Sequence, residues 1–133
     1  MTNFITMPFV QINLAQNLTD EVKKNISGSI HESLVEVFKI PQKDFFQVIH
    51  EVRPSDLLWP DSYLNIPHTG SIVYIQIIAR AGRTPEMKKA LYKAIATKIA
   101  DRTPVGIDDV FIVLVENTVE NWSFGQGIAQ YIQ

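Results

Sequence analysis

Residues 10–52 read VQINLAQNLTDEVKKNISGSIHESLVEVFKIPQKDFFQVIHEV, and residues 75–117 read IQIIARAGRTPEMKKALYKAIATKIADRTPVGIDDVFIVLVEN. The second stretch repeats the first: shifting the chain by 65 positions aligns them without a gap, and 11 of the 43 pairs are identical. The identical pairs include Thr19/Thr84, Asp44/Asp109 and Phe46/Phe111. Two copies are too few for a solenoid, so the repeat predicts a duplicated supersecondary unit.

Each copy of the repeat predicts a strand, a helix and a second strand. Thr19 and Thr84 each precede acidic residues and an apolar stripe with helical spacing, which predicts a helix of about 18 residues after each of them. Runs rich in β-branched and aromatic residues predict strands at 10–14, 45–52, 71–79 and 110–116.

A strand, a helix and a parallel return strand form a right-handed βαβ unit. Two fused units predict an α/β (α+β) fold, in which a four-stranded mixed sheet carries both helices on one face. The other face of the predicted sheet also carries Phe, Val and Ile side chains, so we expect it to pack on another subunit.

The length of 133 residues suits one domain with a real core. We expect an N-terminal extension and one domain over residues 8–133, in which a linker joins the two units and a C-terminal arm follows them. The expected bounds are 1–7 for the extension, about 8–52 and 71–117 for the units, 53–70 for the linker and 118–133 for the arm. The linker contains three prolines and is long for so compact a domain, which predicts a lid or arm as readily as a plain surface crossover.

Composition excludes several classes of function. A net charge of -2 gives no electrostatic case for binding nucleic acid or an anionic membrane. The chain has no cysteine, and no two of its three histidines have the short spacing of a metal site. Its first residues do not form a signal peptide, and no segment approaches the ~18 apolar residues of a membrane span. We therefore expect a cytoplasmic protein without a metal or cofactor.

Pro8 follows Met7 and opens the first predicted strand. If translation began at Met7 and that methionine were removed, Pro8 would carry a free secondary amine, which can act as a base. In the chain as numbered, Met7 acylates this nitrogen, which leaves it no usable basicity. A proline also suits the first residue of a strand for structural reasons alone. Taken by itself, Pro8 favours the structural interpretation.

Several motifs together resemble the tautomerase superfamily, and within it the branch that includes malonate semialdehyde decarboxylase. They are the strand beginning at Met-Pro, the duplicated βαβ unit, Ala-Gly-Arg at 81–83, Val-Glu-Asn at 115–117 and Asn-Trp-Ser-Phe-Gly at 121–125. The resemblance covers the chain from Pro8 to about Gln133. It implies a homotrimer with active sites at subunit boundaries and an amino-terminal proline in an apolar pocket.

Carried over residue by residue, the resemblance implies that Pro8 is the catalytic amine, that Asp44 orients or activates a water, and that Arg83 fixes a substrate carboxylate. It also implies an aromatic wall made by the C-terminal segment: Trp122, Phe124 and Tyr131. Each residue has a plainer interpretation as well. Asp44 can be a turn residue, which its repeat partner Asp109 favours. Arg83 can be a solvated side chain, and the aromatic residues can belong to the core or to a subunit interface.

One departure from the branch concerns its two pocket arginines. The branch reads Arg-Pro-Arg where this chain reads Arg80-Ala81-Gly82-Arg83, so Ala81 stands at the position of the first arginine. Arg80 is one residue away and is a candidate substrate-binding residue, although neighbouring strand residues point to opposite faces. Decarboxylation is therefore less expected than tautomerase chemistry.

The resemblance implies a cofactor-independent tautomerase that interconverts keto and enol forms of a small carboxylate, a 2-oxo or 3-oxo acid, with decarboxylase or hydratase side activity. The residue types suit this chemistry, because a terminal amine titrates near ~8 and an apolar pocket lowers that pKa. One alternative is a non-catalytic small-molecule-binding or structural trimer in which the extension blocks Pro8. Another is a ferredoxin-like domain, which has the same element order but a different strand order.

Overall fold

The computed structural model describes residues 8–68 and 70–132. The expected extension, residues 1–7, lies outside the described residues. The first unit consists of β1 (Phe9–Ala15), α1 (Asp20–Phe38) and β2 (Gln47–Val52). The second unit consists of β5 (Val73–Arg80), α2 (Pro85–Arg102) and β6 (Val110–Asn117). Two short strands lie between them, β3 (Ser62–Tyr63) and β4 (Ile66–Pro67).

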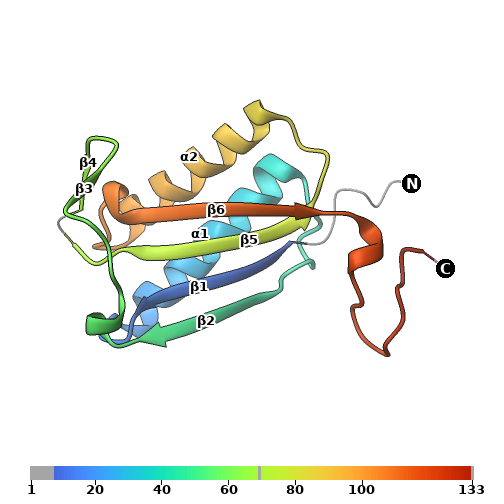
Figure 1. The fold of residues 1–133 in the computed structure, drawn as a ribbon, viewed down its shortest axis with the longest axis horizontal. Helices are drawn as coiled ribbons and strands as arrows, with labels where there is room; N and C mark the ends of the chain where they lie inside the picture. Colours follow the sequence, from blue (N-terminus) through green and yellow to red (C-terminus); the bar gives the residue numbers. More distant parts are fainter. Residues whose placement is uncertain (1–7, 69, 133) are drawn as a thin grey trace.

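The main sheet has the strand order β2-β1-β5-β6 (Figure 1). Within each unit the two strands are adjacent and parallel, and the units meet where β1 runs antiparallel to β5. In this register Phe9 of β1 lies opposite Ile78 of β5. On the other edge of β1, Val10 lies opposite Gln47 of β2. The predicted α/β fold is confirmed, and the ferredoxin-like alternative is wrong because the two strands of each unit are hydrogen-bonded neighbours in the sheet.

The two helices begin where the sequence predicts. The Thr19 hydroxyl accepts a hydrogen bond from the Val22 amide at 3.2 Å, and the Thr84 hydroxyl accepts one from the Met87 amide at 3.2 Å. These caps satisfy amides that the first helical turn leaves without a partner. Pro85 then occupies the first turn of α2, where its missing N–H costs nothing.

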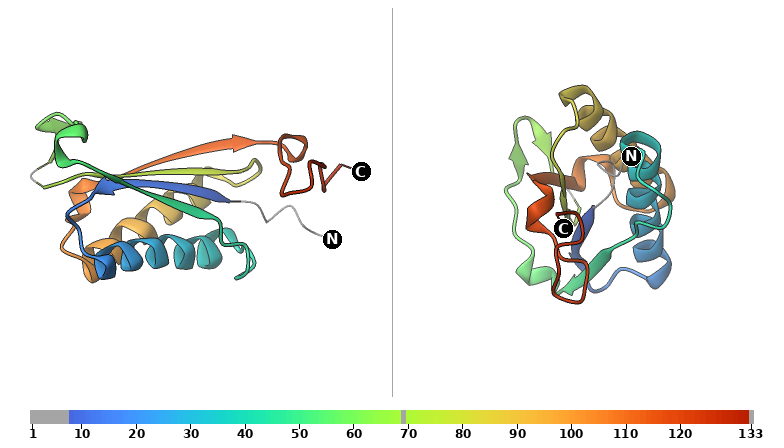
Figure 2. Two further views of the ribbon diagram at one scale, coloured as in Figure 1. Left: turned by 90° about the horizontal axis from the view of Figure 1, so that it is seen from below. Right: turned by 90° about the vertical axis from the view of Figure 1, so that its right-hand side faces the viewer.

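The hydrophobic core lies between the helices and one face of the sheet (Figure 2). Side chains along β5 alternate between buried and half-buried, as expected for a strand whose two faces meet different surroundings. Its buried set packs with the inward stripes of the helices, which include Ile26, Ile30, Leu34, Leu91, Ile95 and Ile99. None of the helices in the described ranges is long and apolar enough to cross a membrane.

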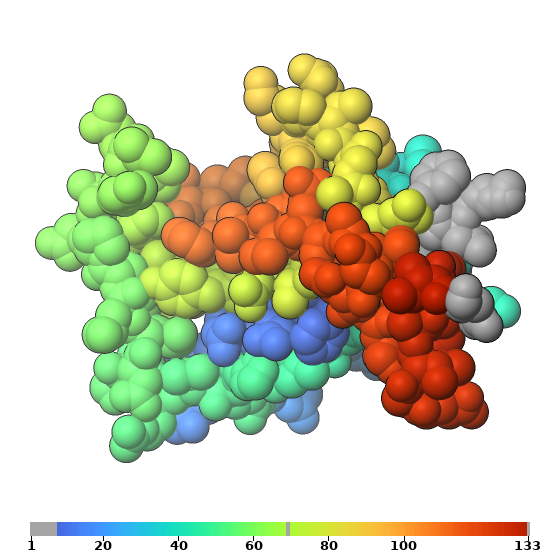
Figure 3. Space-filling model, turned by 45° about the vertical axis from the view of Figure 1, so that its right-hand side comes forward, coloured from blue at the N-terminus to red at the C-terminus, as the bar shows by residue number. Residues whose placement is uncertain are grey.

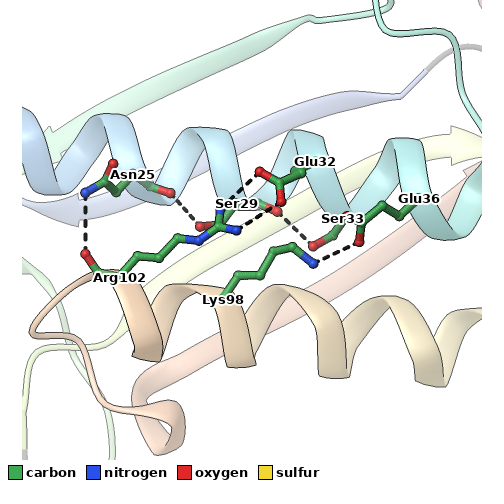
Figure 4. A network of polar contacts seen from close by, with 7 residues as sticks. All are labelled: Asn25, Ser29, Glu32, Ser33, Glu36, Lys98 and Arg102. Carbon is green, nitrogen blue, oxygen red and sulfur yellow. Dashed lines mark hydrogen bonds and ion pairs between the residues drawn. The ribbon is translucent and has the colours of Figure 1, made fainter.

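Ion pairs join the two helices along their outer seam (Figure 4). Arg102 makes two hydrogen bonds to the Glu32 carboxylate, at 2.9 and 3.1 Å, and Lys98 donates one to Glu36 at 2.9 Å. The Arg102 guanidinium holds the pKa of the Glu32 carboxyl below its ordinary value. Ion pairs therefore link the two helices on their exposed side, above the buried Ser29 and Ser33 of α1.

The sheet face that the helices do not cover carries apolar side chains together with polar ones, which include Gln11, Asn13 and Gln76 of the two central strands. We call it the open face, and its exposed apolar side chains include Val48, Phe111, Val113 and Val115. Between 40% and 49% of each of these four side chains is exposed. In Figure 3 this face lies between two protruding segments, one at either end of the sheet.

The first of these protruding segments is the β3–β4 hairpin, which we call the arm. Ser62 pairs with Pro67 and Tyr63 with Ile66, while Leu64 and Asn65 between them adopt positive φ angles of 50° and 65°. Two consecutive left-handed residues match the twist of a tight hairpin. The arm stands on the side of the sheet opposite the helices (Figure 2).

Candidate active site

The candidate residues gather at one end of the sheet, opposite the arm (Figure 1). β1 begins at this end and both β5 and β6 finish there, so Pro8 directly precedes the pair formed by Phe9 and Ile78. Arg80 and Asn117 are the last paired residues of their strands. Residues 118–132, the second protruding segment, fold back at the same end (Figure 3).

Pro8 is buried and borders an open cavity of about 570 Å³, which we call the Pro8 pocket. The pocket is lined by Pro8, Phe9, Phe45, Phe46, Gln47, Val48, Trp122, Ser123 and Phe124. Pairing with β2 begins beside it, where the Val10 amide donates to the Phe46 carbonyl at 3.0 Å. Six of the nine lining side chains are proline or aromatic, so the surroundings of Pro8 are mainly apolar.

The C-terminal segment supplies an aromatic wall. The Trp122 and Phe124 rings are stacked, with centroids 5.6 Å apart, and Tyr131 meets Phe124 edge-on at 5.7 Å. The Trp122 indole donates to the side-chain oxygen of Asn117 at 2.5 Å, which ties the wall to the end of β6. The structure thus places Trp122 and Phe124 at the Pro8 pocket, whereas Tyr131 meets the wall through Phe124 and lines a smaller adjoining cavity.

A side-chain amide closes the turn that follows this wall. The Gln130 oxygen accepts a hydrogen bond from the Phe124 amide at 3.0 Å, and its NH₂ group donates to the Gly125 carbonyl at 2.9 Å. The turn needs positive φ at Gly125, Gln126 and Gly127, with values of 143°, 62° and 70°. Glycine tolerates this conformation without strain at two of the three positions.

Asp44 lies in a small adjoining pocket. This cavity of about 150 Å³ is lined by Asp44, Phe46, Phe124 and Tyr131, and it shares Phe46 and Phe124 with the Pro8 pocket. Asp44 is half-buried in the loop before β2, and its amide donates to the Pro41 carbonyl at 3.0 Å. The carboxylate therefore stands beside the Pro8 pocket and does not line it.

Arg80 and Arg83 line a third, separate cavity of about 420 Å³. The Arg83 guanidinium donates to the Arg80 carbonyl at 2.8 Å, and its Cζ lies 4.7 Å from the centroid of the Phe38 ring. Burial lowers the pKa of Arg83, the Glu116 carboxylate opposes this shift and the Arg80 charge adds to it. The structure therefore places Arg83 at the same end of the sheet but does not bring it into the Pro8 pocket.

Sequence analysis missed several residues around Pro8. Phe45 and Phe46 directly follow Asp44 and were predicted as strand residues, but β2 begins only at Gln47. Their position next to a candidate acid is the signal that could have identified them. Asn117, which holds Trp122, belongs to the Val-Glu-Asn motif, whereas no sequence signal singles out Gln130.

The Pro8 pocket is a mainly apolar cavity beside a proline, and a carboxylate and two arginines lie near it. Such surroundings favour an uncharged amine, and arginines in a partly buried site favour carboxylate ligands. Within residues 8–68 and 70–132, no cluster of His, Asp or Glu side chains is arranged to hold a metal ion.

Comparison with known proteins identifies the family. A family model described as a tautomerase enzyme matches residues 44–125, and a second model with the same description matches residues 8–64. The probable tautomerase YusQ of Bacillus subtilis (strain 168) is 40% identical over 127 residues, which is 96% of this chain and 100% of that protein.

Two solved structures of malonate semialdehyde decarboxylases are also similar. The FG41 enzyme, inhibited by 3-bromopropiolate, is 37% identical with a TM-score of 0.86, covering 93% of this chain and 94% of that chain. A second decarboxylase, studied for decarboxylase and hydratase activities, is 28% identical with a TM-score of 0.84, covering 93% and 95%. Because a family model matches more than half of the sequence and a relative aligns over nearly all of it, the chain belongs to the tautomerase superfamily of enzymes.

Proposed function

We propose that the Pro8 end of the sheet is the active site of a cofactor-independent tautomerase that interconverts the keto and enol forms of a small 2-oxo acid. The observation that carries this proposal is the placement of Pro8, which is buried just before β1 and lines the same cavity as the stacked rings of Trp122 and Phe124. One of the matched family models begins at Pro8, which supports a working chain that starts there.

In this proposal the nitrogen of Pro8 is the general base. As a terminal secondary amine it takes a proton from the carbon next to the carbonyl, and the C–H electrons form the C=C bond. The π electrons of the carbonyl move onto its oxygen, which takes a proton from the Pro8 ammonium, so that the enol forms and the free amine is restored. The apolar pocket disfavours the ammonium form, which lowers the amine pKa from its ordinary ~8 toward neutrality. A base poised near the working pH contributes about 10²–10⁴ in rate.

The substrate carboxylate binds to the arginines at this end. Arg83 offers a planar fork of donors that suits a carboxylate. To bind a molecule seated at Pro8, its guanidinium would leave the Arg80 carbonyl, which is 2.8 Å away. Arg80 is half-buried, lies opposite Asn117 in the sheet, and is the second candidate for this contact.

Asp44 supports the water chemistry of a decarboxylase or hydratase side activity. Its pocket shares Phe46 and Phe124 with the Pro8 pocket, so a water held by Asp44 would lie near a bound substrate. The exposed Ala81 provides no charge where the related branch has its first arginine. We therefore propose tautomerisation, and not decarboxylation, as the main reaction.

We also propose that the working molecule is a homotrimer, as the resemblance implies. The open face supports association of this kind, because Val113 and Val115 are each at least 40% exposed on an otherwise well-packed domain. Contiguous apolar patches of this kind commonly mark protein interfaces.

The test compares two forms of the protein with phenylpyruvate as substrate. One form is the full 133-residue chain, and the other starts at Pro8 after removal of Met7. We expect the shorter form to be at least ~100-fold more active, because only its proline nitrogen can accept a proton. Borohydride reduction in the presence of pyruvate should attach the keto acid to the shorter form alone, at Pro8.

Equal turnover by both forms would remove Pro8 from the mechanism. If neither form turns over phenylpyruvate although both bind it, the protein is a small-carboxylate-binding trimer. Thermal unfolding of both forms is the control, because loss of the folded structure would also abolish turnover.

A further inference from the structure

His31 joins α1 to the loop that carries Asp44. Its Nε2 atom lies 2.9 Å from the carbonyl oxygen of Gln42. A carbonyl oxygen can only accept a hydrogen bond, so Nε2 carries the hydrogen in this contact. The imidazole also packs against the ring of Phe45, with centroids 4.7 Å apart and ring planes inclined by 52°. One side chain of α1 therefore holds both the backbone of this loop and one of its aromatic rings.

These two contacts hold the middle of the loop, residues 39–46. The start of the loop is anchored by Ile40, which is 3% exposed in the core. Its end is anchored by the Phe46 carbonyl, which accepts from the Val10 amide at 3.0 Å. The side chain of Phe45 lies between these anchors and is 53% exposed, so the core does not fix its ring. Loss of the His31 contacts should therefore free the middle of the loop and leave the fold intact.

The middle of the loop borders the proposed active site. The loop lies between the end of α1 and the start of β2, at the Pro8 end of the sheet (Figure 1). Phe45 lines the Pro8 pocket, and Asp44 lines the small cavity that adjoins it. His31 stands behind this wall and is not among the described residues that line either cavity. Any effect of His31 on a bound molecule must therefore pass through Phe45 and Asp44.

The 65-residue repeat shows that the turn in this loop does not need a histidine. The turn that ends at Asp44 is closed by an amide-to-carbonyl hydrogen bond of 3.0 Å, and the equivalent turn that ends at Asp109 is closed by one of the same length. The residue 65 positions after His31 is Ala96, whose methyl group can donate no hydrogen bond and offers no ring. The second unit thus forms the same turn without the contacts of His31.

The two units hold these turns in different ways. Asp109 is buried and its carboxylate accepts from the Gly70 amide at 3.1 Å, so the second turn is fixed by its own aspartate. In the first unit His31 supplies the fixing contact, and Asp44 lines a cavity. The histidine thus performs the structural task that Asp109 performs in the other copy. This leaves the carboxylate of Asp44 at the edge of the Pro8 pocket.

We propose that His31 is a positioning residue that makes the Pro8 pocket selective for 2-oxo acids carrying an aromatic ring. It keeps Phe45 in the pocket wall, where this ring and the stacked rings of the C-terminal segment contact the ring of the substrate. The inference rests on the proposed function of Pro8, and two of its readouts do not require turnover. Because α1 covers the face opposite the open face, His31 stays outside any interface that the open face forms.

Three substitutions separate the two contacts of His31. His31→Ala removes both of them. His31→Gln retains an N–H donor for the Gln42 carbonyl but has no ring, and His31→Phe retains a ring against Phe45 but has no donor. Lys24→Ala, at an exposed position in the first part of α1, is the matched control. Unfolding midpoints show whether each variant is folded.

The first readout is turnover by the form that starts at Pro8, followed as deuterium exchange at C3 of phenylpyruvate and of pyruvate. In His31→Ala we expect kcat/KM for phenylpyruvate to fall about tenfold. The change should lie mainly in KM, because a pocket wall contacts the ground state and the transition state alike. Pyruvate has the same carboxylate and carbonyl but no ring, so its kcat/KM should change less than about twofold. His31→Phe and Lys24→Ala should retain the preference for phenylpyruvate.

The second readout is hydrogen exchange in the full chain without a ligand. The amides of Asp44 and Phe45 donate to carbonyls of the same loop. They should exchange about tenfold faster in His31→Ala and in His31→Phe, and at the wild-type rate in His31→Gln. The Val10 amide, which is bonded within the sheet, should exchange at one rate in all variants.

Equal losses of phenylpyruvate and pyruvate turnover in His31→Ala would overturn the proposal, and so would unchanged exchange of the loop amides. If the wild type turns over neither acid, the proposed function fails and binding decides the role of His31. Phenylacetate binding, followed by the fluorescence of Trp122 in a Trp59→Phe background, should then be weaker in His31→Ala than in the protein that retains His31. Equal affinity of the two proteins, or binding to neither, would overturn the proposal.

Discussion

The guanidinium of Arg83 rests on the ring of Phe38, with Cζ 4.7 Å from the ring centroid. Phe38 is the last residue of α1 and only 1% exposed, so Arg83 is docked on the edge of the core. A cation over an aromatic face in a partly desolvated site gains more than one in open water. Arg83 is therefore anchored outside the Pro8 pocket, and it would have to leave Phe38 and the Arg80 carbonyl to bind a substrate at Pro8.

Replacing Arg83 by Ala should raise KM for phenylpyruvate about 30-fold, which corresponds to the ~2 kcal/mol of a charge-assisted hydrogen bond. The value of kcat should fall as well if the contact tightens in the transition state. Steady-state kinetics measure both. Arg53→Ala, at an exposed arginine of the opposite end, is the control, and unchanged kinetics in Arg83→Ala would exclude this arginine from the site.

Asn117 should act as a positioning residue for Trp122. Asn117→Leu removes the acceptor of the indole N–H, and we expect kcat/KM to fall about fivefold to tenfold, the equivalent of one net hydrogen bond. Asn117→Asp retains an acceptor oxygen and should retain most of the activity. Fluorescence of Trp122 in a Trp59→Phe background should shift to the red only in the leucine variant. Equal behaviour of the two variants in both measurements would argue against positioning.

The ion pair of Glu32 with Arg102 should make stability depend on pH. Because Arg102 lowers the pKa of Glu32, the pair stabilises the fold above the ordinary carboxyl pKa, and this contribution is lost as the pH falls through the lowered value. Arg102→Gln should therefore cost up to ~1 kcal/mol at neutral pH, since both side chains are partly exposed, and less near pH ~3.

Urea unfolding of the wild type and of Arg102→Gln at both pH values measures this difference. Lys93→Gln, at an exposed lysine of α2, controls for the change in net charge. Added salt should reduce the difference at neutral pH. If Arg102→Gln lowers the free energy of unfolding equally in acid and at neutral pH, the effect comes from packing and not from the ion pair.

The open face should control assembly. Val113→Glu places a charge on this face, and light scattering should show dissociation of the proposed trimer, because a buried carboxylate without a partner is costly. Ala90→Glu, on the exposed side of α2, should remain trimeric. A wild type that scatters as a monomer at micromolar concentration would refute the assembly.

The features that could be predicted from the sequence are local or periodic. Thr19 and Thr84 reveal the helix starts because a cap involves residues only three positions apart. The alternation along β5 reveals its buried face for the same reason. The 65-residue repeat also predicts a long-range relationship, namely that the two units have the same strand–helix–strand fold.

The relationships that could not be predicted depend on tertiary distance. Nothing near Arg83 in the sequence indicates that it packs on Phe38, 45 positions earlier, and therefore lines a cavity separate from that of Pro8. The burial of Asp109 beside His68 likewise depends on how the arm folds back. The two aspartates of this repeat pair therefore differ: Asp109 is buried and accepts from the Gly70 amide, whereas Asp44 is half-buried and lines a cavity.

The antiparallel meeting of β1 and β5 has a consequence for the number of possible catalytic amines. The two units are equivalent by the 65-residue repeat, yet a polypeptide has only one amino terminus. Where the first unit has Pro8, the second has Val73, whose nitrogen stays in the amide bond with Ile72. Each copy of the chain can therefore provide at most one amine of the Pro8 type, so a trimer would carry three such bases and not six.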